Sequence, residues 1–309
     1  MKKALFPNSS IPARFLACAS ILAIGSAAQA QITGNLSTSS IHYGSPLAIQ
    51  TVNTGFGDSS GAGSGDDNNG SELDAGYGVV SDGNLYVFLA GDVQGGTSPN
   101  SLQVFIGGGG STSGQSTLNT TISPLSNMNG STFASGFNAT IAFTLNDYSG
   151  TLYTDSANLQ TGGGTGGYVG AVGLTGGIGS GAPAGGSYNL PGFQEAFNNT
   201  QVSTMGASGA ALSGSSSGAN TLTGLELMIP LADLGTINGN IEVMADINNG
   251  GLNYLSNQFL PGLGVGSANV GTAAFTDAGY FTVPVPEPSS LAIMGMSGLG
   301  MLMMFRRRK

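Results

Sequence analysis

Residues 73–90 read LDAGYGVVSDGNLYVFLA. The Asp82-Gly83 dipeptide in this stretch is a strong signal for the tight turn of a β-hairpin. The residues before it contain valines and a tyrosine, and those after it form a short apolar run rich in aromatic and branched side chains, a composition typical of strands. The stretch therefore predicts two antiparallel strands, at 73–80 and 84–90, joined by this turn.

Further strand candidates recur between turn signals, at 102–106, 140–145, 222–229, 241–247 and 279–283. Ile141, Phe143 and Leu145 alternate with smaller or polar side chains, as a half-buried strand requires. We therefore expect one all-β domain over residues 31–283, an antiparallel β-sandwich of jelly-roll type. Helix should be minor, with 193–197 and the turn at 232–234 as the candidates.

Glycine- and serine-rich stretches interrupt the strand pattern. They lie at 107–110, 162–167, 170–186 and 207–220. Such composition is typical of flexible connections, and we expect these stretches to be loops between strands.

The N-terminus has the features of an export signal. Lys2, Lys3 and Arg14 precede an apolar run of about ten residues, which is too short to span a bilayer. Ala28-Gln29-Ala30 has the form that signal peptidase cleaves, so residues 1–30 are predicted to be a signal peptide and Gln31 the mature start. The Sec translocon and signal peptidase are the partners that this predicts. The mature chain then contains no cysteine, because Cys18 lies in the signal.

The C-terminus has the features of a second targeting signal. A proline-rich strip at 284–288 precedes an apolar run, which predicts a short transmembrane helix at 290–305. Arg306, Arg307 and Arg308 follow it and should form a cytoplasmic stop.

Pro286, Glu287 and Pro288, the apolar helix and the arginine-rich end together resemble the PEP-CTERM sorting signal of exported bacterial proteins, over residues 284–309. The resemblance implies recognition and processing by exosortase, a membrane-embedded protease. It also implies transient residence in the inner membrane, followed by delivery to the cell surface or to the extracellular polysaccharide matrix. The alternative is an ordinary C-terminal anchor after a proline-rich linker.

The domain between the two targeting signals also resembles a group of exported PEP-CTERM proteins. The resemblance lies in the stretches 70–77, 85–91, 229–235 and 256–262. The strand order of that group is similar to that of carbohydrate-binding sandwich modules, which makes sugar binding an alternative function. The chain has no tryptophan, so its tyrosines are the candidates for stacking on sugar rings, and Asn257 and Gln258 could hydrogen-bond a hydroxyl. The tyrosines are Tyr43, Tyr77, Tyr86, Tyr148, Tyr153, Tyr168, Tyr188, Tyr254 and Tyr280. Each is also compatible with a half-buried position in a strand.

Charge is distributed very unevenly along the chain. All 16 acidic residues lie between Asp58 and Glu287, where there is no lysine or arginine. The exported part therefore cannot form an internal Lys or Arg salt bridge, and nucleic-acid binding is excluded because phosphates would be repelled. Anionic polysaccharide would be repelled too, unless a divalent cation bridged it to the protein.

A short acidic span before the first hairpin raises calcium as a cofactor, since calcium binds six to eight oxygen ligands. The candidate ligands are Asp66, Asp67, Asn68, Glu72 and Asp74. Their spacing does not fit an EF-hand, and the alternative is a solvated polar turn.

The sequence offers little for catalysis. His42 is the only histidine, which leaves no zinc ligand set, and no serine lies in a nucleophile elbow. A glycoside hydrolase needs two carboxylates, and Glu226 and Glu242 are candidates that we expect to face solvent. We therefore expect a non-catalytic exported protein with a structural or adhesive role. A carbohydrate-binding module, with or without calcium, is the first alternative and a glycoside hydrolase the second.

Overall fold

The computed structural model describes residues 31–50, 56, 71–108, 113–160, 162–200, 221–236, 239–263, 267–272 and 274–286. The chain divides between Ala30 and Gln31 into two units, and every described residue belongs to the second. The predicted signal peptide and the predicted transmembrane helix at 290–305 lie outside the described residues.

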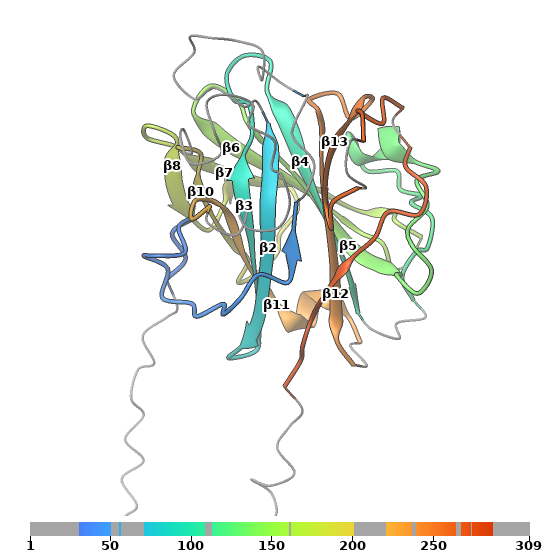
Figure 1. Cartoon of the computed structure of the whole chain (residues 1–309), viewed down its shortest axis with the longest axis horizontal. Helices are drawn as coiled ribbons and strands as arrows, with labels where there is room; N and C mark the ends of the chain where they lie inside the picture. Colours follow the sequence, from blue (N-terminus) through green and yellow to red (C-terminus); the bar gives the residue numbers. More distant parts are fainter. Residues whose placement is uncertain are drawn as a thin grey trace, which may run out of the picture. The chain divides into compact units, whose positions relative to one another are not determined.

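Two antiparallel sheets make up the described part (Figure 1), as the sequence predicts for an all-β sandwich. The first sheet has six strands, in the order β1 (Ala48–Ile49), β2 (Glu72–Ser81), β3 (Asn84–Asp92), β11 (Gly224–Pro230), β10 (Gln194–Asn198) and β8 (Ile178–Gly181). The second has eight, in the order β13 (Leu255–Leu260), β12 (Ile241–Asn249), β4 (Asn100–Gly108), β5 (Ala139–Asp147), β6 (Thr151–Asn158), β7 (Thr165–Gly173) and β9 (Ala184–Gly185), with β14 (Phe281–Val283) also paired to β12. Two 3-10 helices are described, η1 (Leu125–Met128) and η3 (Leu231–Leu234), and the second confirms the predicted turn at 232–234.

The hairpin of β2 and β3 forms around the predicted dipeptide. Asp82 and Gly83 have φ angles of 50° and 78°, the left-handed conformation that a two-residue hairpin turn needs. Ser81 and Asn84 are paired across the turn, and Val80 faces Leu85. The turn thus sets the register of β2 against β3 next to it.

The main core lies between the two sheets. Along β5, Ile141, Phe143 and Leu145 all point into it, as their alternation predicts. Phe143 stacks on Phe193, the residue before β10, with ring centroids 5.0 Å apart. Burial of such side chains contributes roughly 1.5–3 kcal/mol each to the free energy of folding.

A second apolar cluster covers part of the outer face of the second sheet. Phe105 and Met244 point outward from β4 and β12 and pack beneath residues of the 113–138 and 267–280 segments. Phe105, for example, contacts Phe133 and Phe275 at centroid distances of 5.1 and 6.0 Å. This layer leaves the outer surface along β6 and β7 uncovered in part, and partly exposed side chains line that region.

The glycine-rich stretches are not simply loops, so that prediction was wrong at 162–186. Strands β7, β8 and β9 lie within them. A Cβ atom at Gly166 would lie 2.2 Å from the Ser156 carbonyl oxygen, and one at Gly170 would lie 2.7 Å from the Ala184 nitrogen. Glycine is therefore used here to let neighbouring strands approach closely.

The predicted helix at 193–197 was also wrong. These residues overlap β10, which pairs with β8 on one side and β11 on the other. Strand pairing overrides the local pattern, because Phe193 and Phe197 are both needed in the core between the sheets. Strands β6 and β13 were not predicted either.

Candidate functional site

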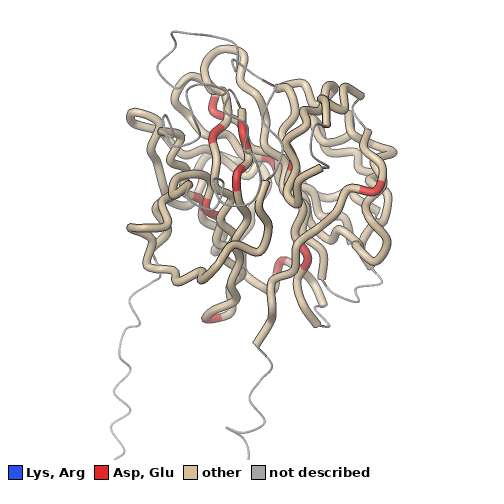
Figure 2. The backbone as a smooth tube through the Cα atoms, in the orientation of Figure 1, with Lys and Arg blue, Asp and Glu red and all other residues tan. Residues whose placement is uncertain are grey.

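Figure 2 marks the positions of acidic residues along the backbone, and the described part contains no lysine or arginine. Several of the acids are buried nonetheless. Glu195 points between the sheets, where it accepts a hydrogen bond of 2.5 Å from the Thr154 hydroxyl. Burial raises the pKa of Glu195 from 4.5 to about 8, although the bond from Thr154 lowers it. With no cation available, burial favours the neutral acid.

Asp246 is a second buried acid, on the outer face of the second sheet. Its side chain is fully buried, and neither carboxyl oxygen has a hydrogen-bond partner. Burial raises the pKa of Asp246 well above its usual value. Neither Glu195 nor Asp246 was singled out from the sequence, because their burial depends on how distant parts of the chain pack in the folded protein.

Glu226 does not face solvent, so that expectation was wrong. It lies on the outer face of the first sheet and is buried under the segment that starts at Gln31. One carboxylate oxygen accepts hydrogen bonds from the backbone N–H groups of Thr33 (2.8 Å) and Gly34 (3.0 Å). The other accepts from the Ser39 hydroxyl (2.5 Å) and the Tyr43 hydroxyl (2.8 Å). Glu226 therefore fastens the N-terminal segment to the sheet.

Glu242 lies far from Glu226. It is partly exposed on β12, and its neighbours Ile241 and Val243 point into the core, so its side chain faces outward from the second sheet. Stacked sheets are about 10 Å apart, and the two carboxylates lie on opposite outer sides of the sandwich. They are thus farther apart than the roughly 5–10 Å of a glycosidase pair. This geometry does not provide a glycosidase site from Glu226 and Glu242.

The predicted calcium ligands are only partly described. Asp66, Asp67 and Asn68 lie outside the described residues, whereas Glu72 and Asp74 are buried on β2. Burial, followed by the charge of Asp74, raises the pKa of Glu72, and burial raises the pKa of Asp74 from 3.8 to about 6. Within the described ranges, no three His, Cys, Asp or Glu side chains are placed to share a metal ion. Calcium binding by this span stays a prediction.

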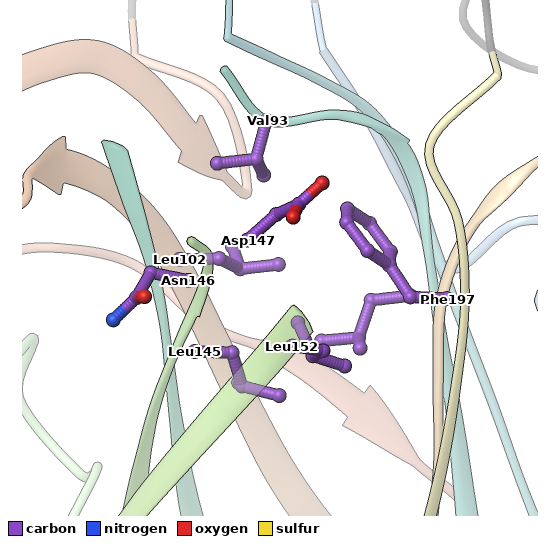
Figure 3. A pocket seen from close by; sticks show the side chains of 8 residues that line it. Val93, Leu102, Leu145, Asn146, Asp147, Leu152 and Phe197 are labelled. Atoms are coloured by element: carbon purple, nitrogen blue, oxygen red, sulfur yellow. The ribbon is translucent and has the colours of Figure 1, made fainter. Parts of the chain in front are cut away.

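The cavity in Figure 3 lies between the sheets and is too small for a ligand. Its volume is about 10 Å³, enough for roughly one water molecule. The carboxylate of Asp147 lies between Val93 and Phe197 at this cavity (Figure 3). Asp147 accepts a hydrogen bond of 3.0 Å from the Gly150 N–H and thereby stabilises the turn between β5 and β6.

The candidate sugar-binding side chains differ widely in accessibility. Tyr77 and Tyr86 are buried, whereas Tyr148 and Tyr254 are 47% and 46% exposed. The remaining tyrosines, Tyr43, Tyr153, Tyr168, Tyr188 and Tyr280, are partly buried.

Asn257 and Gln258 do not fit their predicted role, because both are buried. Gln258 accepts a hydrogen bond from the Leu73 N–H (3.2 Å), which joins β13 of the second sheet to β2 of the first. It also donates a hydrogen bond to the side chain of Asn257 (3.1 Å). His42 is exposed at the surface.

The C-terminal end of the domain leads directly to the predicted sorting residues. Val283 is buried at the end of β14, where it pairs with Ile241. Pro284 and Pro286 are exposed immediately afterwards, while Val285 packs partly against the core. The chain thus leaves the sandwich with Pro286 in solvent. Glu287, Pro288 and Arg306 to Arg308 lie outside the described residues, as do the cleavage residues Ala28 and Ala30.

A scan against protein families matches residues 284–309 to the PEP-CTERM protein-sorting motif. The chain carries a PEP-CTERM sorting motif. The match begins at the residue after β14, so the domain and the motif are contiguous. Comparison with curated proteins found no match, and comparison with solved structures found none either.

The PEP-CTERM motif implies that the protein is exported, anchored through its C-terminal signal and processed by an exosortase-type membrane system. Proteins with this motif are generally non-enzymatic surface proteins. No helix within the described residues is long and apolar enough to cross a membrane, and the predicted span lies outside them.

Proposed function

We propose that the protein is a non-catalytic structural or adhesive component of the cell surface or extracellular polysaccharide matrix. It reaches that place through the Sec translocon, signal peptidase and then an exosortase. The observation that supports this is the direct passage from the β-sandwich into the PEP-CTERM motif, with Pro286 exposed just beyond the last strand. A membrane protease that reads Pro286, Glu287 and Pro288 needs them clear of the folded domain.

The sandwich itself supports a passive role. Glu226 fastens a segment of the fold, Asp147 holds a turn, and Glu195 has its carboxyl in the core. Each of these three acids therefore has a role in the structure of the fold. None of them is paired with a second carboxylate that could act with it as general acid and base.

We expect Glu287→Ala, or replacement of Arg306, Arg307 and Arg308 by alanine, to leave the protein unprocessed in the inner membrane. The first change removes the acidic centre of the motif, and the second removes the positive charges that hold the tail inside. The measurement is fractionation and mass analysis in an exosortase-positive host.

Asp277→Asn is the matched control for this experiment. It also removes one carboxylate, but from an exposed position upstream of β14, so sorting should be unchanged. Normal processing and normal location of the Glu287→Ala protein would contradict the proposal.

A further inference from the structure

Three tyrosines form a row on the uncovered part of the second sheet. Tyr148 follows β5, Tyr153 lies on β6 and Tyr168 on β7. The ring centroids of Tyr148 and Tyr153 are 6.5 Å apart, and those of Tyr153 and Tyr168 are 6.1 Å apart. The strand neighbours Leu152 and Val169 point into the core, so Tyr153 and Tyr168 point outward.

A groove adjoins this row where β4 begins and where β5 and β12 end. Its volume is about 520 Å³. It is lined by Tyr148, by Asn146 and Asn100, and by the segments 98–99 and 249–251. Asn146 is the cross-strand partner of Tyr153, so the groove and the tyrosine row form one continuous surface.

The side-chain amide of Asn146 is available to a ligand. It is partly exposed and makes no hydrogen bond with any other residue of the described ranges. By contrast, Asn100 and Asn249 use their amides within the protein, toward Ser71 and Asn253. A planar amide beside an aromatic ring can bond a hydroxyl of a ligand that rests on the ring.

The charge of this surface selects among ligands. The described chain has no lysine or arginine to bind a phosphate, sulfate or carboxylate group. Asp155, which pairs with Tyr168 within the row, would repel such groups and can accept hydrogen bonds from hydroxyls. This surface suits an uncharged ligand that has one apolar face and many hydroxyl groups. The apolar face can rest on the aromatic rings, and the hydroxyl groups can hydrogen-bond to the Asn146 amide and the Asp155 carboxylate.

We propose that Tyr148, Tyr153 and Tyr168, together with Asn146, bind a neutral polysaccharide. The proposal rests on the proposed function, since a matrix protein meets such polymers at its destination. The tyrosine rings stack on sugar rings, while Asn146 and Asp155 hydrogen-bond their hydroxyls. No catalytic step is involved.

The test is native affinity electrophoresis of the full chain, solubilised in a detergent without a sugar headgroup. The gels contain mixed-linkage β-glucan, xylan, galactomannan or dextran, with the anionic polymer alginate for comparison. We expect at least one neutral polysaccharide to retard the protein and alginate to leave it unretarded. No retardation by any of the four neutral polymers, or retardation by alginate alone, would overturn the proposal.

Variants then locate the site. The double change Tyr148→Ala with Tyr153→Ala should weaken binding by about tenfold or more, because two stacking rings are lost. Tyr148→Phe keeps the ring and should bind as tightly as the parent. Tyr254→Ala is the matched control, since Tyr254 is equally exposed but lies outside the row and stacks on Phe56.

Undiminished binding of the double variant would overturn the assignment. If thermal denaturation shows that the double variant is unfolded, Tyr148→Ala alone decides, because its exposed side chain contributes little to the core. The single change should weaken binding about threefold, and unchanged affinity would refute the site. Binding is measured on purified protein and sorting in cells, so failure of one leaves the other standing.

Discussion

The free energy of unfolding should fall as the pH rises from about 4 to about 8, and Glu195 contributes to this fall together with the other buried acids Glu72, Asp74 and Asp246. The pKa of Glu195 is raised from 4.5 to about 8 in the folded protein because it is buried. Between these values the folded state holds a proton that the unfolded chain has released. The stability is therefore fully present below pH 4.5 and is lost as the pH rises through about 8. At 1.36 kcal/mol per pKa unit the loss is about 5 kcal/mol.

Glu195→Gln tests this directly by urea denaturation at several pH values. Glutamine resembles the protonated acid and can still accept the hydrogen bond from Thr154. The variant should match the parent near pH 4 and exceed it in stability by several kcal/mol near pH 9. Asp277→Asn, which also removes one carboxyl group but from an exposed position, is the matched control. A parent protein that gains stability between pH 4 and 8, or a Glu195→Gln protein with an unaltered slope, would contradict the expectation.

Glu226→Ala should destabilise the protein by about 3 kcal/mol or more. The change leaves four donors without their acceptor, namely two backbone N–H groups and the hydroxyls of Ser39 and Tyr43. Hydrogen bonds to a charged group are worth about 1.5–3 kcal/mol each, and buried donors that lose their partners add a desolvation cost. Hydrogen exchange should show faster exchange of the Thr33 and Gly34 amides.

Two milder variants, Glu226→Gln and Tyr43→Phe, should lower the free energy of unfolding by smaller amounts. Glutamine keeps one oxygen for the two backbone N–H groups, and Tyr43→Phe removes a single bond. Both should cost less than Glu226→Ala, about 1–2 kcal/mol. Equal protection of Thr33 in the parent and in Glu226→Ala would show that the segment is held by other contacts.

Strands with clear alternation or clear turn signals could be predicted from the sequence. The Asp82-Gly83 hairpin is one case, and β5, with Ile141, Phe143 and Leu145 on one side, is another. Strands β7, β8 and β9 could not, because glycine has no side chain to show a period. Their pairing depends on close approach, as at Gly166 beside Ser156, which only the folded partner strand provides.

The sorting motif could be predicted because its parts are contiguous in the sequence, and the family match at 284–309 bears this out. The tyrosine row could not be singled out among nine tyrosines. Tyr153 and Tyr168 meet only through the register of β6 and β7, which shifts between Thr154 and Asp155. The prediction that Glu226 faces solvent was wrong for a similar reason, since the sequence around Glu226 does not indicate that residues 31–43 fold over it.

The most direct test of the central claim is terminal peptide mapping, with the intact mass, of the protein isolated from its native source. A chain that is exported through one signal and sorted through the other should begin at Gln31 and should lack the arginine-rich tail that ends at Lys309. A mature protein that still begins at Met1, or that still ends at Lys309, would contradict the account.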